Sequence, residues 1–310
     1  MMKTIVRKLL YLAAVLFGVS VLSFALLQLS GRDAATAIAL RTLDSSAENI
    51  ERIRTEMGLD GTPAERYGKW LGSFLTGDLG YSTYSGHAVA EDIAANVPIT
   101  AALMGLAMLW IILFGTPAAL YCAYKPNRLF DHITRLLTII GICLPTFWVG
   151  YVLLVVFAVK MQVVTVTPQP GIAGLILPSL ALALPSTSSF IRVFRSSLLK
   201  EMSAEYCLIA KTRGLSRGRV LLRHALRNAL PPAVTLLMQY VGYLFVGTVL
   251  VESVFSISGL GSYLLSCALA SDSSALAACL MLSAAVYVVF NLAGELINRL
   301  LCPKNGRRTA

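Results

Sequence analysis

Long apolar stretches without charge alternate with short charged segments along this chain of 310 residues. Each of the four clearest stretches is at least about 20 residues long, enough for a helix to cross a hydrocarbon core of about 30 Å. Two further uncharged runs leave room for one span each. The pattern predicts an all-α integral membrane protein with six transmembrane helices. The expected spans are Leu9–Leu29, about Ile99–Tyr124, Leu136–Val159, about Leu175–Ile191, Asn228–Val251 and Ser273–Gly294.

The composition supports a membrane protein. Hydrophobic residues make up 56% and charged residues 14% of the chain, and the mean hydropathy is +0.72. A water-soluble domain carries roughly a quarter of its residues as charged groups. Lys3, Arg7 and Lys8 precede the first apolar run, as they would in a secretory signal. Because that run is about 20 residues long rather than about 7–15, we interpret it as a retained helix.

The positive charge, +10 overall, is distributed by side of the membrane. Basic residues gather before the first span, between the second and third, between the fourth and fifth, and after the sixth. The intervening segment 31–98 is net acidic, and 252–275 contains no basic residue. This positive-inside pattern places both termini in the cytoplasm. It predicts contact with anionic lipid headgroups and no nucleic-acid partner.

The topology divides the chain into four parts, and the segment 31–98 carries local structure of its own. Its first helix follows the capping-box form Ser45-Ser46-Ala47-Glu48 and ends at Gly58. Its second helix starts at Thr62-Pro63, with Thr62 as cap, and ends at Gly77. We expect the two helices to lie over the outer mouth of the bundle, as a lid or as a membrane-surface scaffold without a ligand role. The parts are 1–30 (cytoplasmic N-terminus and first transmembrane helix), 31–98 (extracytoplasmic helical segment), 99–302 (five-helix core with a cytoplasmic loop at 192–228) and 303–310 (cytoplasmic tail).

The loop 192–228 predicts a short helix with defined ends. Ser203 is a candidate N-cap, and Glu205 lies in the first turn, where the helix dipole favours an anion. Lys211 and Arg213 fall in the last turn, where cations are favoured, and Gly214 supplies a left-handed stop. A solvated loop would explain the cations but neither the cap nor the stop.

A second helix is expected after Ser216, with Arg219, Arg223 and Arg227 on one face as it runs into the next span. A charged side chain costs about 2.5–3.5 kcal/mol at the bilayer centre, so these cations lie outside the membrane. The sequence therefore predicts a short, terminated helix held in the cytoplasm between two spans. This placement suits a helix that another protein binds and moves.

The same residues resemble a known family. The segment from Glu205 to Ser216, followed by Leu221 to Pro231, is similar to the EAA loop of permeases in binding-protein-dependent ABC importers. Three more segments are similar to the dipeptide, oligopeptide and nickel branch of that family, so the resemblance covers essentially the whole chain. These segments are Gly77-Asp78-Leu79-Gly80-Tyr81-Ser82, Leu144-Pro145-Thr146-Phe147-Trp148 and Val251-Glu252-Ser253-Val254-Phe255.

The resemblance implies a type I importer permease of the bacterial plasma (inner) membrane. It implies a second permease subunit, usually in a heterodimer, two cytoplasmic ABC ATPases and an extracytoplasmic solute-binding protein. Glu205, Ala210, Gly214 and Leu215 match the motif positions of the ATPase-coupling loop. The solute would be a peptide, nickel or a small metal chelate. Because the chain has no GxxxxGK[ST] phosphate loop, ATP hydrolysis would belong to the partner ATPases.

Two other classes of protein fit the sequence less well. An intramembrane enzyme would need metal ligands or an acid–base pair within the spans, but His87, His132 and His224 all fall in loops. We therefore expect no enzyme activity, no metal site and no cofactor. An ion-coupled secondary transporter or channel is the alternative, and ion coupling is usually marked by acidic residues or broken helices near the midplane. Such acidic residues are missing from the predicted spans.

Overall fold

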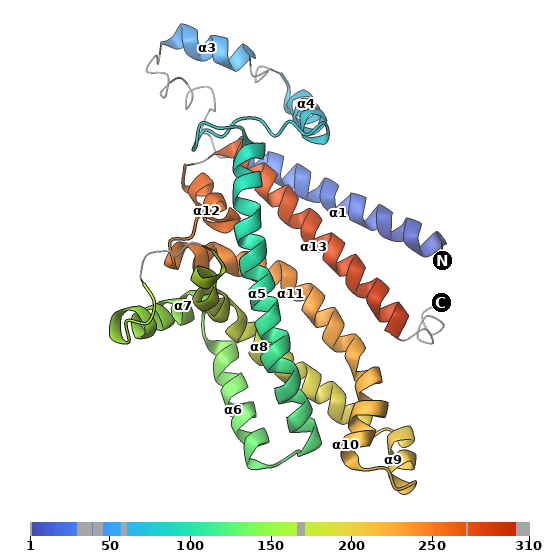
Figure 1. Cartoon of the computed structure of the whole chain (residues 1–310). Helices are drawn as coiled ribbons and strands as arrows, with labels where there is room; N and C mark the ends of the chain where they lie inside the picture. Colours follow the sequence, from blue (N-terminus) through green and yellow to red (C-terminus); the bar gives the residue numbers. More distant parts are fainter. Residues whose placement is uncertain are drawn as a thin grey trace. The chain divides into compact units, whose positions relative to one another are not determined.

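The computed structural model of the chain describes residues 2–29, 39, 46–56, 61–165, 171–270 and 272–301 (Figure 1). Helices dominate these ranges, and they contain no strand; an isolated antiparallel bridge pairs Tyr81 with Ala88. The helices are α1 (Met2–Leu29), α3 (Ala47–Glu56), α4 (Pro63–Leu75), α5 (Val89–Tyr124), α6 (Leu129–Cys143), α7 (Thr146–Leu154), the π-helical turn η1 (Val155–Lys160), α8 (Ile172–Met202), α9 (Glu205–Thr212), α10 (Arg217–Val220), the π-helical turn η2 (Leu221–Ala225), α11 (Leu226–Val254), α12 (Leu260–Ala270) and α13 (Ser273–Leu301).

The chain forms two compact units. The first unit comprises 1–99 and 258–288, and the second comprises 100–257 and 289–310. The first unit therefore holds α1, α3, α4, α12 and the loop between α4 and α5. The second unit holds the helices from α6 to α11, and the long helices α5 and α13 belong in part to each.

Four helices of the described residues are long and apolar enough to cross a membrane: Val89–Tyr124, Ile172–Met202, Arg217–Val254 and Ser274–Asn298. They contain the expected second, fourth, fifth and sixth spans. The expected first span lies in α1, whose described apolar stretch is the shorter Ala13–Ala25. The third span meets the same criterion only if two bent helices are taken together, which gives up to five spans in all.

The third span differs from the single continuous helix that the uncharged run Leu136–Val159 predicts. α6 ends at Cys143, α7 begins at Thr146, and their axes differ by 102°. Leu144 has extended backbone angles (φ −80°, ψ 125°), as expected for a residue that precedes a proline. Pro145 forms the N-cap of α7, where its missing N–H removes no helical hydrogen bond. The proline therefore breaks the run rather than kinking it.

α8 is the central helix of the second unit and packs against α6, α7 and α11. Its buried residues include Phe190, Phe194 and Leu198. Small residues on neighbouring helices allow the close approach: a Cβ at Gly115 would lie 2.6 Å from the Phe190 ring, and one at Gly247 would lie 2.7 Å from Leu182. Glycine contacts of this kind are typical of helices packed within membranes.

In the first unit, α4 packs on α1 through aromatic rings. The ring of Tyr67 lies 5.4 Å from that of Phe24 and 6.1 Å from that of Trp70, and the Tyr67 hydroxyl is 2.8 Å from Ser20 Oγ. The predicted cap of α4, Thr62, is confirmed, and the structure adds a capping box, because Thr62 Oγ1 accepts from Glu65 N and Glu65 Oε2 accepts from Thr62 N. Hydrogen bonds from the Thr62 backbone N–H and the Thr62 side chain to the exposed Glu65 carboxyl lower its pKa.

α3 also forms, but its start was predicted one residue too early. Asn49 N donates to Ser46 Oγ at 3.3 Å, so Ser46 caps α3, whereas Ser45 lies outside the described residues. Gly58, the predicted end of this helix, lies outside the described residues, whereas Gly77, the predicted stop of α4, has a positive φ of 88°.

Candidate functional site

The candidate site is the segment between α8 and α11, in which α9 forms a helix of its own (Figure 1). Glu205 lies in the first turn of α9, as predicted. The predicted cap is wrong, because Ala204 is the N-cap residue and has no capping side chain. Ser203 instead ends α8, where its Oγ donates to Lys200 O at 2.8 Å.

The end of α9 has the hydrogen bonds of a Schellman motif. Gly214 has φ +84°, and its N–H donates to Lys211 O at 2.9 Å. The N–H of Leu215 reaches further back, to Ala210 O at 3.3 Å. Lys211 lies in the last turn as expected, and Arg213 is the C-cap residue. The left-handed stop predicted at Gly214 is therefore confirmed.

One face of α9 is packed against the rest of the second unit. Cys207 and Ala210 are buried, and Lys211 Nζ donates to Met202 O at 3.2 Å. The Tyr206 hydroxyl donates to the Glu201 carboxylate at the end of α8. Burial raises the pKa of both the Tyr206 hydroxyl and the Cys207 thiol, so both groups stay protonated near neutral pH. α9 is thus attached firmly to α8.

The opposite face of α9 is open. Glu205, Leu208 and Ile209 are exposed there, and the side chains of Leu208 and Ile209 keep 48% and 52% of their surface exposed. Two large aliphatic side chains exposed side by side, with charged residues around them, are typical of a protein contact surface. Of the four residues assigned to coupling, Glu205 and Gly214 are exposed, Leu215 is partly exposed and Ala210 is buried.

The helix that follows α9 starts after Ser216, as predicted, but is not regular. The π-helical turn Leu221–Ala225 interrupts it before α11 begins. No pattern of residues predicted this turn, and such turns often lie at functional sites. Arg219, Arg223 and Arg227 are all exposed, and Arg217 donates from its guanidinium to Ala123 O of α5 at 3.3 Å.

A buried ion pair that the sequence did not predict lies in the same unit. Arg195 of α8 donates from Nε and Nη2 to the two carboxylate oxygens of Asp131, each at 2.6 Å. Asp131 is fully buried in the first turn of α6, and it also accepts from Asn127 N at 2.9 Å. The pair joins α6 to the part of α8 that leads to α9.

A second buried carboxylate belongs to Glu252, near the end of α11. It is fully buried and accepts from Thr100 Oγ1 of α5 at 2.6 Å. The sequence placed Glu252 in a motif segment but did not indicate its burial. This hydrogen bond holds the end of α11 against α5.

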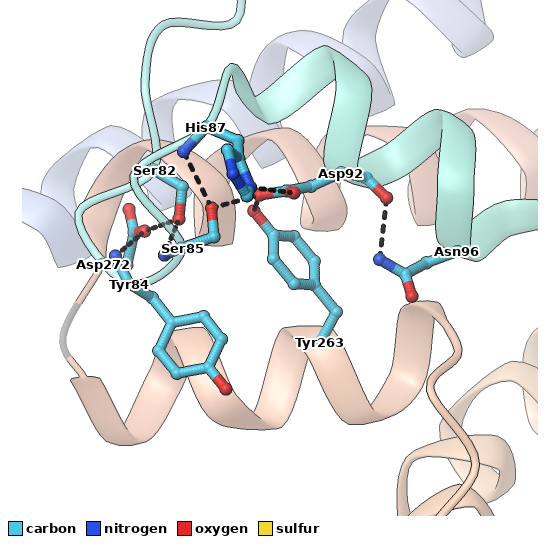
Figure 2. Close-up of polar contacts among 8 residues, drawn as sticks. All are labelled: Ser82, Tyr84, Ser85, His87, Asp92, Asn96, Tyr263 and Asp272. Atoms are coloured by element: carbon cyan, nitrogen blue, oxygen red, sulfur yellow. Dashed lines mark hydrogen bonds and ion pairs between the residues drawn. The ribbon is translucent and has the colours of Figure 1, made fainter.

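In the first unit, two aspartates organise the loop between α4 and α5 (Figure 2). Asp272 is buried and accepts from Ser82 Oγ at 2.6 Å and from Tyr84 N at 3.0 Å. It also accepts from Ala275 N at 3.2 Å, which makes it the N-cap of α13. One carboxylate therefore joins the loop to the start of α13.

Asp92 does the same for α12. Its carboxylate accepts from Tyr263 Oη at 2.9 Å and from Ser85 Oγ, and His87 Nδ1 lies 3.6 Å away (Figure 2). Burial raises the pKa of the Tyr263 hydroxyl, which keeps it protonated as the donor. Through these two carboxylates, the loop that carries the Gly77–Ser82 motif is joined by hydrogen bonds to the start of α13 and to α5, which in turn is bonded to α12.

Within the described ranges, no three His, Cys, Asp or Glu side chains come together as a group that could hold a metal ion.

Comparison with known proteins settles the family. The model of the family described as binding-protein-dependent transport system inner membrane component matches residues 115–307, which include α9 and its attachments. A second model, for the N-terminal part of such membrane components, matches residues 1–104. The chain belongs to this family. It is therefore the permease of an ABC importer, a multi-pass transport component of the inner membrane rather than an enzyme.

Curated relatives match this permease along its whole length. It is 31% identical over 303 residues to the glutathione transport system permease protein GsiC of Escherichia coli (strain K12), which covers 98% of each chain. The proteins of the same name from Shigella flexneri serotype 5b and Shigella boydii serotype 4 are 31% and 30% identical, again over 98% of each chain. The resemblance seen in the sequence motifs is thereby confirmed.

Proposed function

We propose that this permease has six spans with both termini in the cytoplasm and imports peptides, nickel or a small metal chelate. It would act with a second permease, two cytoplasmic ABC ATPases and an extracytoplasmic binding protein that delivers the solute. Peptides include glutathione, the solute named for the relatives. The residue ranges 1–30, 31–98, 99–302 and 303–310 would be the inner terminus with the first span, the outer segment, the core and the inner tail.

The observation that carries the proposal is the two-faced character of α9. The buried face of α9 is held to α8 by side-chain packing and hydrogen bonds, and its opposite face exposes Leu208 and Ile209. Because α9 is attached to α8 in this way, a force on the exposed face of α9 also moves α8. Because α8 runs from Ile172 to Met202 without interruption, a movement that an ATPase imposes on α9 would reach the spans.

The four coupling residues would then have different roles. Glu205 and the exposed aliphatic pair would contact the ATPase directly. Ala210 is buried at 6% exposure, so it would position α9 rather than contact the partner. Gly214 and Leu215 would hold the end of α9 through the Schellman hydrogen bonds. Closure of the ATPases on ATP would move α9 and switch the spans between inward-open and outward-open states.

The dependence on an ATPase is tested by reconstitution. We expect vesicles that contain both permeases and both ATPases to take up labelled glutathione or a labelled dipeptide only with binding protein outside and ATP inside. Vesicles with the same permeases but no ATPase, or with an ATPase whose phosphate-loop lysine is replaced, are the controls. Uptake by the permeases alone would show that the chain is a channel or an ion-coupled transporter instead.

The contact made by Glu205 is tested by Glu205→Lys. The exposed carboxylate lies at the N-terminus of α9, and a cation there opposes the helix dipole and any basic partner surface. We expect uptake to fall at least about tenfold, which corresponds to about 1.4 kcal/mol of coupling free energy. Ser196→Lys introduces a lysine at an exposed position of α8 and is expected to leave uptake near normal. Equal uptake by the two variants, at equal amounts in the membrane, would argue against this role.

A further inference from the structure

One face of α11 is exposed along most of its length. The exposed positions recur every three or four residues, which places them on one side of a helix. The opposite side is buried and includes Val241, Leu244 and Thr248. At 1.5 Å per residue the exposed face extends about 27 Å, close to the thickness of the hydrocarbon core. This face, called the α11 stripe, consists of Thr235, Gln239, Tyr243, Val246, Leu250 and Ser253.

The α11 stripe differs in chemistry from the exposed faces of α5 and α6 in the second unit. Between Ala101 and Pro117, the exposed positions of α5 carry only apolar side chains or none, among them Leu109 and Leu113. The exposed positions of α6 between Leu136 and Ile140 are also apolar. Those faces suit lipid. The α11 stripe instead carries an amide, a phenol and two hydroxyls at intervals of one or a few turns.

The two ends of the α11 stripe satisfy their own hydroxyl groups. Thr235 Oγ1 donates to Pro231 O at 3.0 Å and accepts from Asn298 Nδ2 at 2.6 Å. Ser253 Oγ donates to Val249 O at 2.7 Å. Hydroxyls bonded in this way need no partner from outside the chain. The polar groups that require an explanation are therefore those in the middle.

Gln239 and Tyr243 lie in the middle of α11, where lipid tails would offer no hydrogen bond. Both side chains are exposed, and Tyr243 keeps 73% of its surface exposed. A primary amide in hydrocarbon is unfavourable unless another protein group or water meets it. The exposed face of α11 therefore faces something polar at the depth of the membrane centre.

We propose that the α11 stripe lines the solute path, and that Gln239 and Tyr243 contact the solute near mid-membrane. This inference rests on the proposed function, because it needs a solute that crosses between the permeases. Both side chains donate and accept hydrogen bonds without carrying charge, so they match the amide groups of a peptide better than a bare cation. Uncharged contacts also let a solute leave as readily as it enters, which a transport path requires.

Cysteine accessibility tests the proposal on the assembled transporter. All six cysteines are first replaced, and Gln239→Cys, Tyr243→Cys and two controls are made in that background. Leu137→Cys lies on the exposed apolar face of α6, and Leu244→Cys lies on the buried side of α11. The probe is a charged, membrane-impermeant methanethiosulfonate, applied from each side of the vesicles with and without ATP.

We expect positions 239 and 243 to react at least tenfold faster than both controls in at least one of these conditions. Modification is also expected to block uptake of a labelled dipeptide. Reaction no faster than that of Leu137→Cys would overturn the proposal. So would a disulfide formed under an added thiol oxidant between position 239 and a cysteine introduced into the second permease, because the stripe would then be a contact between permeases. ATP-dependent uptake by the cysteine-free transporter tests the proposed function separately, so the two failures are distinguishable.

Discussion

Replacing Gly214 with valine is expected to lower ATP-driven uptake at least about tenfold, which corresponds to about 1.4 kcal/mol. Gly214 has φ +84°, and a left-handed backbone costs a residue with a Cβ roughly 1–2 kcal/mol, with β-branched residues among the least tolerant. A Cβ at this position would meet nothing within 4 Å, so the expected loss comes from the backbone and not from a clash. The end of α9 would unwind, and the hydrogen bond from Leu215 N to Ala210 O would be lost.

Gly214→Asn is the matched control, because asparagine tolerates the left-handed conformation better than other residues. We expect it to retain most of the uptake, whereas Gly214→Pro should be as harmful as valine because it also removes the N–H that bonds to Lys211 O. Uptake is measured in vesicles with equal amounts of permease, judged by immunoblot of the membrane fraction. If the valine and asparagine variants transport equally well, the conformation of Gly214 has no role in coupling.

The ends of α9 show which features could be predicted from sequence. Glu205 in the first turn and Gly214 at the stop depend on interactions within a few residues, and both predictions are confirmed. The cap was placed at Ser203 because serine is a good capping residue. In the structure α8 continues to Met202, so Ser203 is used to end that helix. The choice between the two roles depends on where the preceding helix stops.

The spans show a similar division. Uncharged runs predicted where the long apolar helices lie, because hydrophobic length is a property of the local sequence. Pro145 indicated that the third span could bend, but a complete break there was not predicted, because an uncharged run has the same composition whether its helix is continuous or divided. Proline permits a bend, but the 102° between α6 and α7 is decided by their packing, and α7 lies against α8 and α11.

The buried carboxylates could not have been found from sequence alone. Asp131 looked like one charge of a cytoplasmic loop, and its partner Arg195 is 64 residues away. The contacts of Asp272 and Glu252 span 190 and 152 residues. No local pattern of residues encodes such pairs, although the burial of an acidic residue near a helix end becomes obvious once the helices are placed.

Breaking the pair between Asp131 and Arg195 is expected to have the largest effect on stability. Asp131 is fully buried and Arg195 keeps only 17% of its side chain exposed, so Arg195→Gln leaves a carboxylate without its charged partner. Removing one member of a buried ion pair costs about 3–5 kcal/mol, and we expect the thermal midpoint of the purified permease to fall by roughly 5 °C or more.

The control for that measurement is Arg192→Gln, which removes an exposed cation one turn earlier on α8 and is expected to leave the midpoint nearly unchanged. The exchange of the two residues, Asp131→Arg with Arg195→Asp, is expected to recover part of the lost stability, because the charges would again be paired. Since the pair joins α6 to the part of α8 that leads to α9, Arg195→Gln should also uncouple ATP hydrolysis from uptake in the assembled transporter. Equal midpoints for Arg195→Gln and Arg192→Gln would mean that the ion pair contributes nothing to holding α8 in place, and that the displacement of α9 must reach the spans through α10 and α11 instead.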